Sequence, residues 1–120
     1  MDREALFAFV KDAYGTKPEY LFSSSPETAV LRHTRNRKWY AITMPIPAKR
    51  LGLESDDIID VLNLKCNPDD GAALRMTEGV FPAYHMNKKH WISVVYSMVP
   101  EGLLLSLLET SYQLTSPKKS

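Results

Sequence analysis

The sequence predicts a two-layer α+β domain, in which an antiparallel sheet of about five strands carries helices on one face. Apolar residues repeat at helical spacing near both ends of the chain, and short apolar, β-branched segments lie between them. Several of these segments are separated only by short polar turns, so they can pair as hairpins. Hairpin-connected strands form antiparallel sheets, and helices with a single apolar stripe cover one face of such a sheet.

The first helix is expected at residues 2–14, because Asp2 can cap its free N–H groups and Gly15 can end it. The last helix is expected to begin after Pro100, where leucines repeat at helical spacing. Residues 115–120 are expected to form a frayed tail. Both helices have one apolar stripe, so each can cover a sheet.

The strands and the middle helix complete the expected order α-β-β-β-β-α-β-α. In the middle helix, Asn67 is the expected cap, Pro68 takes the first helical position and Gly79 is expected to end it. Prolines 45 and 47 are expected to break the sheet, because proline cannot donate a ladder hydrogen bond. The expected strands are 18–24, 27–33, 37–44, 58–66 and 91–96.

Length and composition indicate one soluble globular domain. The chain has 120 residues, of which 44% are apolar and 24% charged, close to the globular average. The single cysteine, Cys66, cannot form an internal disulfide, and no apolar run approaches the roughly 18 residues of a membrane helix. We therefore expect a cytoplasmic protein without a membrane association, present as a monomer or weak dimer and needing no cofactor.

Charge is segregated along the chain although the net charge is only +1. This net charge excludes a globally basic nucleic-acid protein, so any such function must come from local patches. Between residues 79 and 100 there are no acids, and Lys88 and Lys89 are the only full positive charges. Between residues 28 and 53 there are again no acids, against six bases: Arg32, Arg35, Arg37, Lys38, Lys49 and Arg50.

Residues 82–96, PAYHMNKKHWISVVY, contain two of the three histidines and two adjacent lysines. His85 and His90 are five residues apart, and the other nitrogen or sulfur donors, His33 and Cys66, are not in a paired motif, so we expect no metal site. Cys66 could act as a nucleophile beside His85 or His90, and this remains an alternative to a non-enzymatic protein.

An anion-binding loop is the main interpretation of this stretch. Lys88 and Lys89 can neutralise phosphates, while His85, Asn87 and His90 can donate hydrogen bonds to them. The following apolar segment, expected to be a strand, would hold such a loop rigidly. The structural alternative is a solvated turn that only connects two elements.

Several segments resemble the MmcQ/YjbR-like family of small bacterial proteins. The signature stretch is GVFPAYHMNKKHWISV at residues 79–94, and the resemblance extends to LNLKCNPDDGAALR (62–75), RKWYAIT (37–43) and VPEGLLLSLLETSYQLT (99–115). It implies a fold related to the frataxin-like and secretion-chaperone-like architectures, and DNA binding by a "double wing". The residues that match its motif are His85, Asn87, Lys88, Lys89 and His90; Gly102 departs from it.

The leading hypothesis is therefore a non-enzymatic DNA-binding protein with little sequence preference. Its phosphate contacts would come from the 85–90 loop and from the 32–38 hairpin with Arg35, Arg37 and Lys38. The main rival is a protein-interaction or chaperone-like adaptor that uses the sheet face or an edge strand to hold a peptide. A third possibility is a small-molecule site with His85 and His90 as polar anchors.

Overall fold

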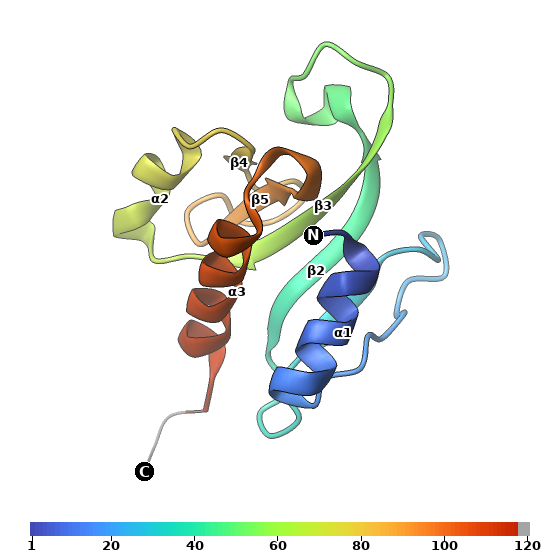
Figure 1. The fold of residues 1–120 in the computed structure, drawn as a ribbon, viewed down its shortest axis with the longest axis vertical. Coiled ribbons are helices and arrows are strands. Elements are labelled where there is room, and N and C mark those ends of the chain that lie inside the picture. The colour runs from blue at the N-terminus through green and yellow to red at the C-terminus, as the bar shows by residue number, and fades with distance from the viewer. Residues whose placement is uncertain (118–120) are drawn as a thin grey trace.

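The computed structural model describes residues 1–117 and shows a five-stranded antiparallel sheet with three helices, which confirms the predicted α+β class (Figure 1). The strand order across the sheet is β1-β2-β3-β5-β4. The elements are α1 (Arg3–Tyr14), β1 (Ala29–Arg32), β2 (Trp39–Pro47), the 3-10 turn η1 (Ala48–Leu51), β3 (Ile58–Lys65), α2 (Pro68–Arg75), β4 (Val80–Pro82), β5 (Trp91–Val95), the 3-10 turn η2 (Tyr96–Met98) and α3 (Glu101–Thr115).

The predicted caps of α1 and α2 are confirmed. The Asp2 carboxylate accepts a hydrogen bond from the Ala5 N–H at 2.8 Å, and Gly15 ends α1 in the left-handed conformation. The Asn67 side chain accepts from the Asp69 N–H at 3.0 Å. However, α2 ends at Arg75, and Gly79 lies in the turn that leads into β4, so the expected end at Gly79 is wrong.

β2 runs through Pro45 and Pro47, so the expectation that these prolines break the sheet is wrong. The reason lies in the strand pairing. β1 pairs with β2 only as far as Thr43, opposite Ala29, and beyond that point β2 bonds β3 alone. On that side β2 is an edge strand, where a missing N–H costs no ladder bond.

The strand expected at residues 18–24 is also absent. Glu19 makes an isolated bridge to Val30, and Tyr20 to Phe22 are exposed. The sheet still has five strands, because β4, a segment of three residues that was not among the predicted strands, takes the place of the strand expected at 18–24. β4 pairs with β5 through Val80 and Val94.

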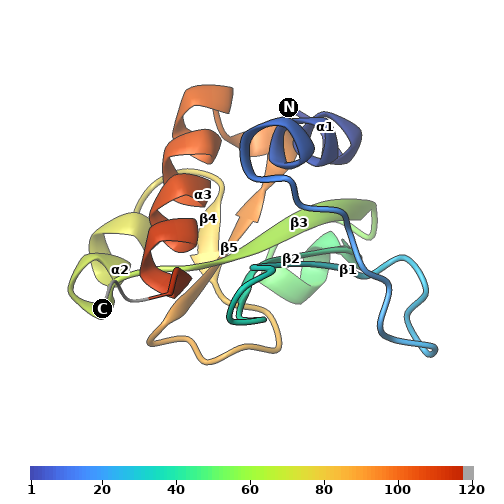
Figure 2. The same cartoon turned by 90° about the horizontal axis from the view of Figure 1, so that it is seen from below.

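The two faces of the sheet are covered differently. Helices α1 and α3 lie on one face, as Figure 2 shows, and bury the main core there. The opposite face, called the second face below, contains Val61, Asn63, Ser93 and Val95, which pair across β3 and β5. No α-helix of residues 1–117 packs on this second face. Leu51 of η1 and Tyr84 of the β4–β5 connection pack there beside Phe81 of β4.

The end of α3 is docked on the sheet by buried hydroxyls. The Ser111 hydroxyl donates to the Tyr40 carbonyl at 2.5 Å and accepts from the Lys65 N–H at 2.8 Å. Thr115 is buried and bonds His33 at 2.8 Å. Thr115 is thus part of the helix, which corrects the tail expected at 115–120; residues 118–120 lie outside the described part.

Within residues 1–117, none of the helices has the length and apolar content needed to cross a bilayer.

Candidate nucleic-acid interface

The loop between β4 and β5, residues 83–90, is fastened to the second face by buried polar groups. The Asn63 side-chain amide donates to the Tyr84 carbonyl at 3.0 Å, and the Tyr84 N–H donates to the Ser93 hydroxyl at 2.8 Å. The Ser93 hydroxyl in turn donates to the Asn63 side-chain carbonyl at 2.5 Å. Asn63 and Ser93 are both fully buried. We call these two side chains and the Tyr84 backbone the loop clamp.

Asn87 organises the tip of this loop. Its side-chain oxygen accepts from the Lys89 N–H at 2.8 Å, and its carbonyl accepts from the N–H groups of His90 and Trp91. Asn87 therefore shapes the turn with its side-chain oxygen, while the predicted phosphate contact would use its side-chain N–H groups. The turn leaves Lys88 and Lys89 exposed to solvent.

His85 is held in a left-handed backbone conformation, with φ of 56°. Residues other than glycine adopt it at a cost, so surrounding contacts must impose it. The clamp on the neighbouring Tyr84 supplies such contacts, and the two rings lie 3.9 Å apart between centroids. The His85 side chain is exposed.

The second half of the loop is tied to β3 and α2 through the main chain. The Cys66 N–H donates to the His90 carbonyl at 2.8 Å, and the Arg75 guanidinium lies 3.4 Å from the Lys88 carbonyl. His90 is half-buried. Both ends of the loop are thus anchored, and its two lysines project from a fixed frame.

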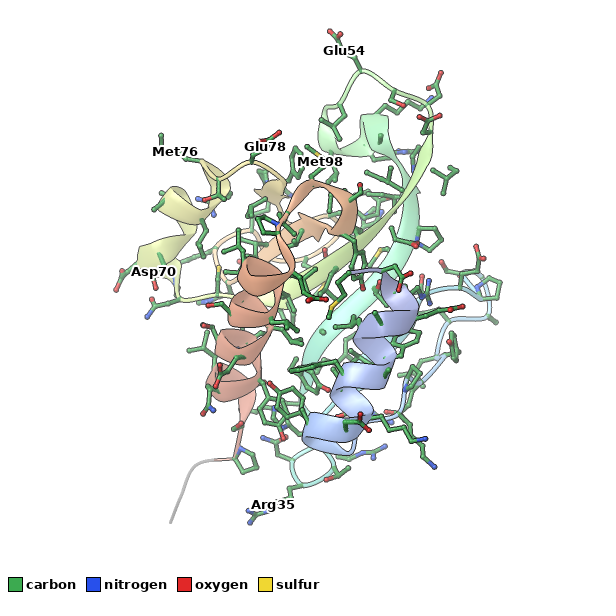
Figure 3. All side chains as sticks on the ribbon, viewed as in Figure 1. Arg35, Glu54, Asp70, Met76, Glu78 and Met98 are labelled. Carbon is green, nitrogen blue, oxygen red and sulfur yellow. The ribbon has the colours of Figure 1, made fainter. Side chains whose placement is uncertain are left out.

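The β1–β2 hairpin carries the other three predicted site residues. Arg35 projects away from the body of the protein at the tip (Figure 3), and Lys38 is exposed. Arg37 lies 3.9 Å from the Glu19 carboxylate, which Arg32 binds with two hydrogen bonds. The Arg32 guanidinium lowers the pKa of Glu19, so this carboxylate stays ionised. The charge of Arg37 is therefore partly offset.

The two basic segments lie at the same end of the sheet. β2 begins at this end, β3 finishes there with Lys65, and β5 begins there with Trp91 opposite Lys65. Figure 2 looks onto this end, where the hairpin also contacts the end of α3 through the Asn36 amide and the Thr115 carbonyl. The sheet twist separates the two segments, with the hairpin at the bottom of Figure 1 and the loop beside β5.

A family model described as YjbR matches residues 11–114. The chain belongs to the YjbR family. It is 46% identical over 116 residues to the protein YyaQ of Bacillus subtilis (strain 168), covering 96% of this chain and 98% of that protein. This confirms the family resemblance found in the sequence.

Two solved structures share the fold. A crystal structure from Pseudomonas syringae superimposes with a TM-score of 0.94 at 41% identity, covering 97% of this chain and 100% of that one. The Deinococcus radiodurans protein DR2400 gives a TM-score of 0.72 at 28% identity, over 96% of this chain and 78% of that one.

Cys66, the alternative nucleophile of this YjbR chain, is buried at the end of β3. Burial raises the pKa of its thiol, which keeps it protonated, whereas a nucleophilic cysteine needs a lowered pKa. Its bond to His90 is made by the main chain. Among residues 1–117, no three His, Cys, Asp or Glu side chains gather closely enough to hold a metal ion.

Sequence reasoning missed three residues of this region of the YjbR fold. Asn63 and Ser93 are polar residues within apolar strands. This contrast could have identified them, because a buried amide or hydroxyl needs a hydrogen-bond partner. Arg50, in η1, lies beside His85 and Lys88 in one cleft. Arg50 is far from the loop in sequence, so no sequence pattern links it to this cleft.

Proposed function

We propose that this protein is a non-enzymatic DNA-binding protein that contacts duplex phosphates with little sequence preference. The observation that carries the proposal is the position of its two acid-free basic segments. The 85–90 loop and the 32–38 hairpin lie at one end of the sheet, where β2 and β5 begin and β3 ends. Two separated cationic turns on a firm frame suit the regularly spaced phosphates of a duplex.

The proposed binding is electrostatic. Lys88, Lys89, Arg35 and Lys38 are exposed and can reach phosphates. Affinity should therefore fall steeply with salt, and base-specific contacts should contribute little, since each phosphate contact releases condensed counterions whatever the sequence.

A salt titration of duplex binding tests the proposal. Replacing Lys88 and Lys89 together with alanine should flatten the slope of log affinity against log salt by roughly 2, because each phosphate contact contributes about 0.9. A matched double variant, Lys11→Ala with Lys49→Ala, removes two exposed lysines from other regions and should leave the slope unchanged.

The hairpin supplies an internal comparison. Arg35→Ala should weaken DNA binding more than Arg37→Ala, because Glu19 already offsets the Arg37 charge. If the slope of log affinity against log salt falls equally in the loop variant and in its control, DNA binding depends only on the net charge of the protein. Parent protein that retains no DNA at low salt would overturn the proposal.

The second candidate is a protein-interaction adaptor. Three consecutive large apolar side chains, Tyr20, Leu21 and Phe22, are 56%, 46% and 38% exposed beside the edge strand β1. Such a strip suits a peptide or protein partner. This candidate leads if the DNA test fails.

A further inference from the structure

A cleft of about 330 Å³ opens where η1 approaches β4 and the 83–90 loop. Its polar wall contains two cations, Arg50 from η1 and Lys88 from the loop, together with His85. Its apolar wall includes Leu51, Phe81 and Tyr84. None of the side chains lining it within residues 1–117 is acidic.

We propose that this cleft binds one small phosphorylated ligand with a flat aromatic body, of the nucleoside monophosphate class. Arg50 and Lys88 would bind the phosphate, His85 would donate to it, and Tyr84 and Phe81 would contact the base. This site goes beyond the DNA proposal and does not depend on it, since Arg50 belongs to neither basic segment of that interface.

The chemistry of the polar wall favours phosphate. Arginine binds phosphate through paired N–H donors and lysine as a point charge, and hydrogen bonds to ionised groups are among the strongest in proteins. Arg50 and Lys88 come from segments 38 positions apart in the sequence and meet at one cleft. No acidic side chain of the described residues lines this wall, so none of them competes with an anionic ligand for Arg50 and Lys88.

The aromatic wall favours a base. Tyr84 and Phe81 are half-buried, so their rings are fixed by packing on the second face and yet reach the cleft. Stacking of a base on an aromatic side chain contributes about 1–3 kcal/mol and tolerates every base. The cleft volume is near the lower limit of small-molecule sites, roughly 300 Å³, which suits a single nucleotide.

The backbone around His85 indicates that the site is formed before a ligand arrives. Residues held at positive φ concentrate at ligand-binding positions, where surrounding structure imposes the strain. Here the loop clamp fixes Tyr84, and His85 follows it into the cleft at φ 56°. A preformed site avoids the entropy cost of ordering the loop on binding.

Two pairs of adjacent basic residues provide matched controls. Arg50 lines the cleft, while its neighbour Lys49 lies 3.3 Å from the Asp56 carboxylate. Lys88 lines the cleft, while Lys89 is exposed in the same loop and is not part of the lining. Within each pair, replacing either residue with alanine removes one positive charge from nearly the same position, but only one of the two residues lines the cleft.

The test uses the full chain and isothermal titration with AMP, adenosine and inorganic phosphate. AMP should bind about tenfold or more tightly than either fragment alone, since both walls contribute. Arg50→Ala and Lys88→Ala should each weaken AMP binding about tenfold or more, as for charge-assisted hydrogen bonds. Lys49→Ala and Lys89→Ala should stay within about twofold, and thermal unfolding verifies that all four variants are folded.

NMR shift mapping with AMP locates the site, and the expected changes cluster at residues 50–51 and 81–88. A 5′-phosphorylated oligonucleotide tested alongside AMP distinguishes a free nucleotide from a strand end as the source of the ligand. Equal losses of AMP affinity in the Lys88→Ala and Lys89→Ala variants would overturn the proposal. Chemical-shift changes that never saturate as AMP is added would also overturn it. The Arg50→Ala protein should also be tested for duplex DNA binding. If it has lost AMP binding but still binds the duplex, this site is distinct from the DNA interface.

Discussion

Ser93→Ala should loosen the 83–90 loop and destabilise the whole domain, although it deletes a single oxygen. The Ser93 hydroxyl accepts from the Tyr84 N–H and donates to Asn63 inside the sheet. Without it, the Tyr84 N–H and one acceptor of Asn63 are buried with no partner. Each unsatisfied buried polar group costs about 1–3 kcal/mol, so the two together should lower the free energy of unfolding by about 2–6 kcal/mol.

Two measurements check this expectation. Urea denaturation gives the loss of stability, and amide hydrogen exchange at Tyr84 reports on the clamp itself. Ser97→Ala, at an exposed serine in η2, is the matched control and should stay within about 0.5 kcal/mol of the parent. A Ser93→Ala protein with the parental midpoint and an equally protected Tyr84 amide would refute the assignment of these side chains as the clamp.

Three further predictions concern backbone strain and a buried histidine. Burial lowers the pKa of His33, so the folded state favours the neutral ring. The free energy of unfolding should therefore fall as the pH drops below about 6.5, where the unfolded chain takes up the proton. Denaturation at about pH 7 and pH 5 should show a smaller loss of stability for His33→Gln than for the parent. Gly79→Ala should lower the free energy of unfolding in urea by about 2 kcal/mol, because φ is 87° and the new Cβ would lie 2.6 Å from a Val99 methyl. Gly102→Ala is the contrasting variant: its Cβ meets open space and should stabilise α3 by about 1 kcal/mol. His85→Gly should leave the unfolding free energy unchanged or raise it by up to about 1 kcal/mol, while His85→Val should lower it by about 1–2 kcal/mol.

Local chemistry predicted the helices well. The caps at Asp2 and Asn67 act within three residues, so the chain reveals them without a partner. The strands were harder, because their limits depend on pairing. The sequence cannot show that β1 begins only at Ala29, opposite Thr43. This start leaves the following part of β2 without a partner on that side, which permits Pro45 and Pro47 there.

The candidate site was predicted in part for the same reason. The family motif and the charge pattern placed the cations of the 85–90 loop and the hairpin in advance. They could not place Arg50 and Lys88 in the same cleft, since η1 and the 83–90 loop are brought together only by the fold. Nor could they show that Asn87 uses its side-chain oxygen to build the turn.

The docking of the final turns of α3 has a consequence for protein synthesis. Ser111 satisfies Tyr40 and Lys65, which precede it by 71 and 46 residues, and the Thr115 carbonyl accepts from Asn36 across 79 residues. All five strands are therefore translated before the groups that complete their hydrogen bonding exist. Contacts of such long range slow folding and leave sheet edges unprotected meanwhile. A nascent chain that stops short of Ser111 holds every strand and still lacks the contacts that close the native sheet.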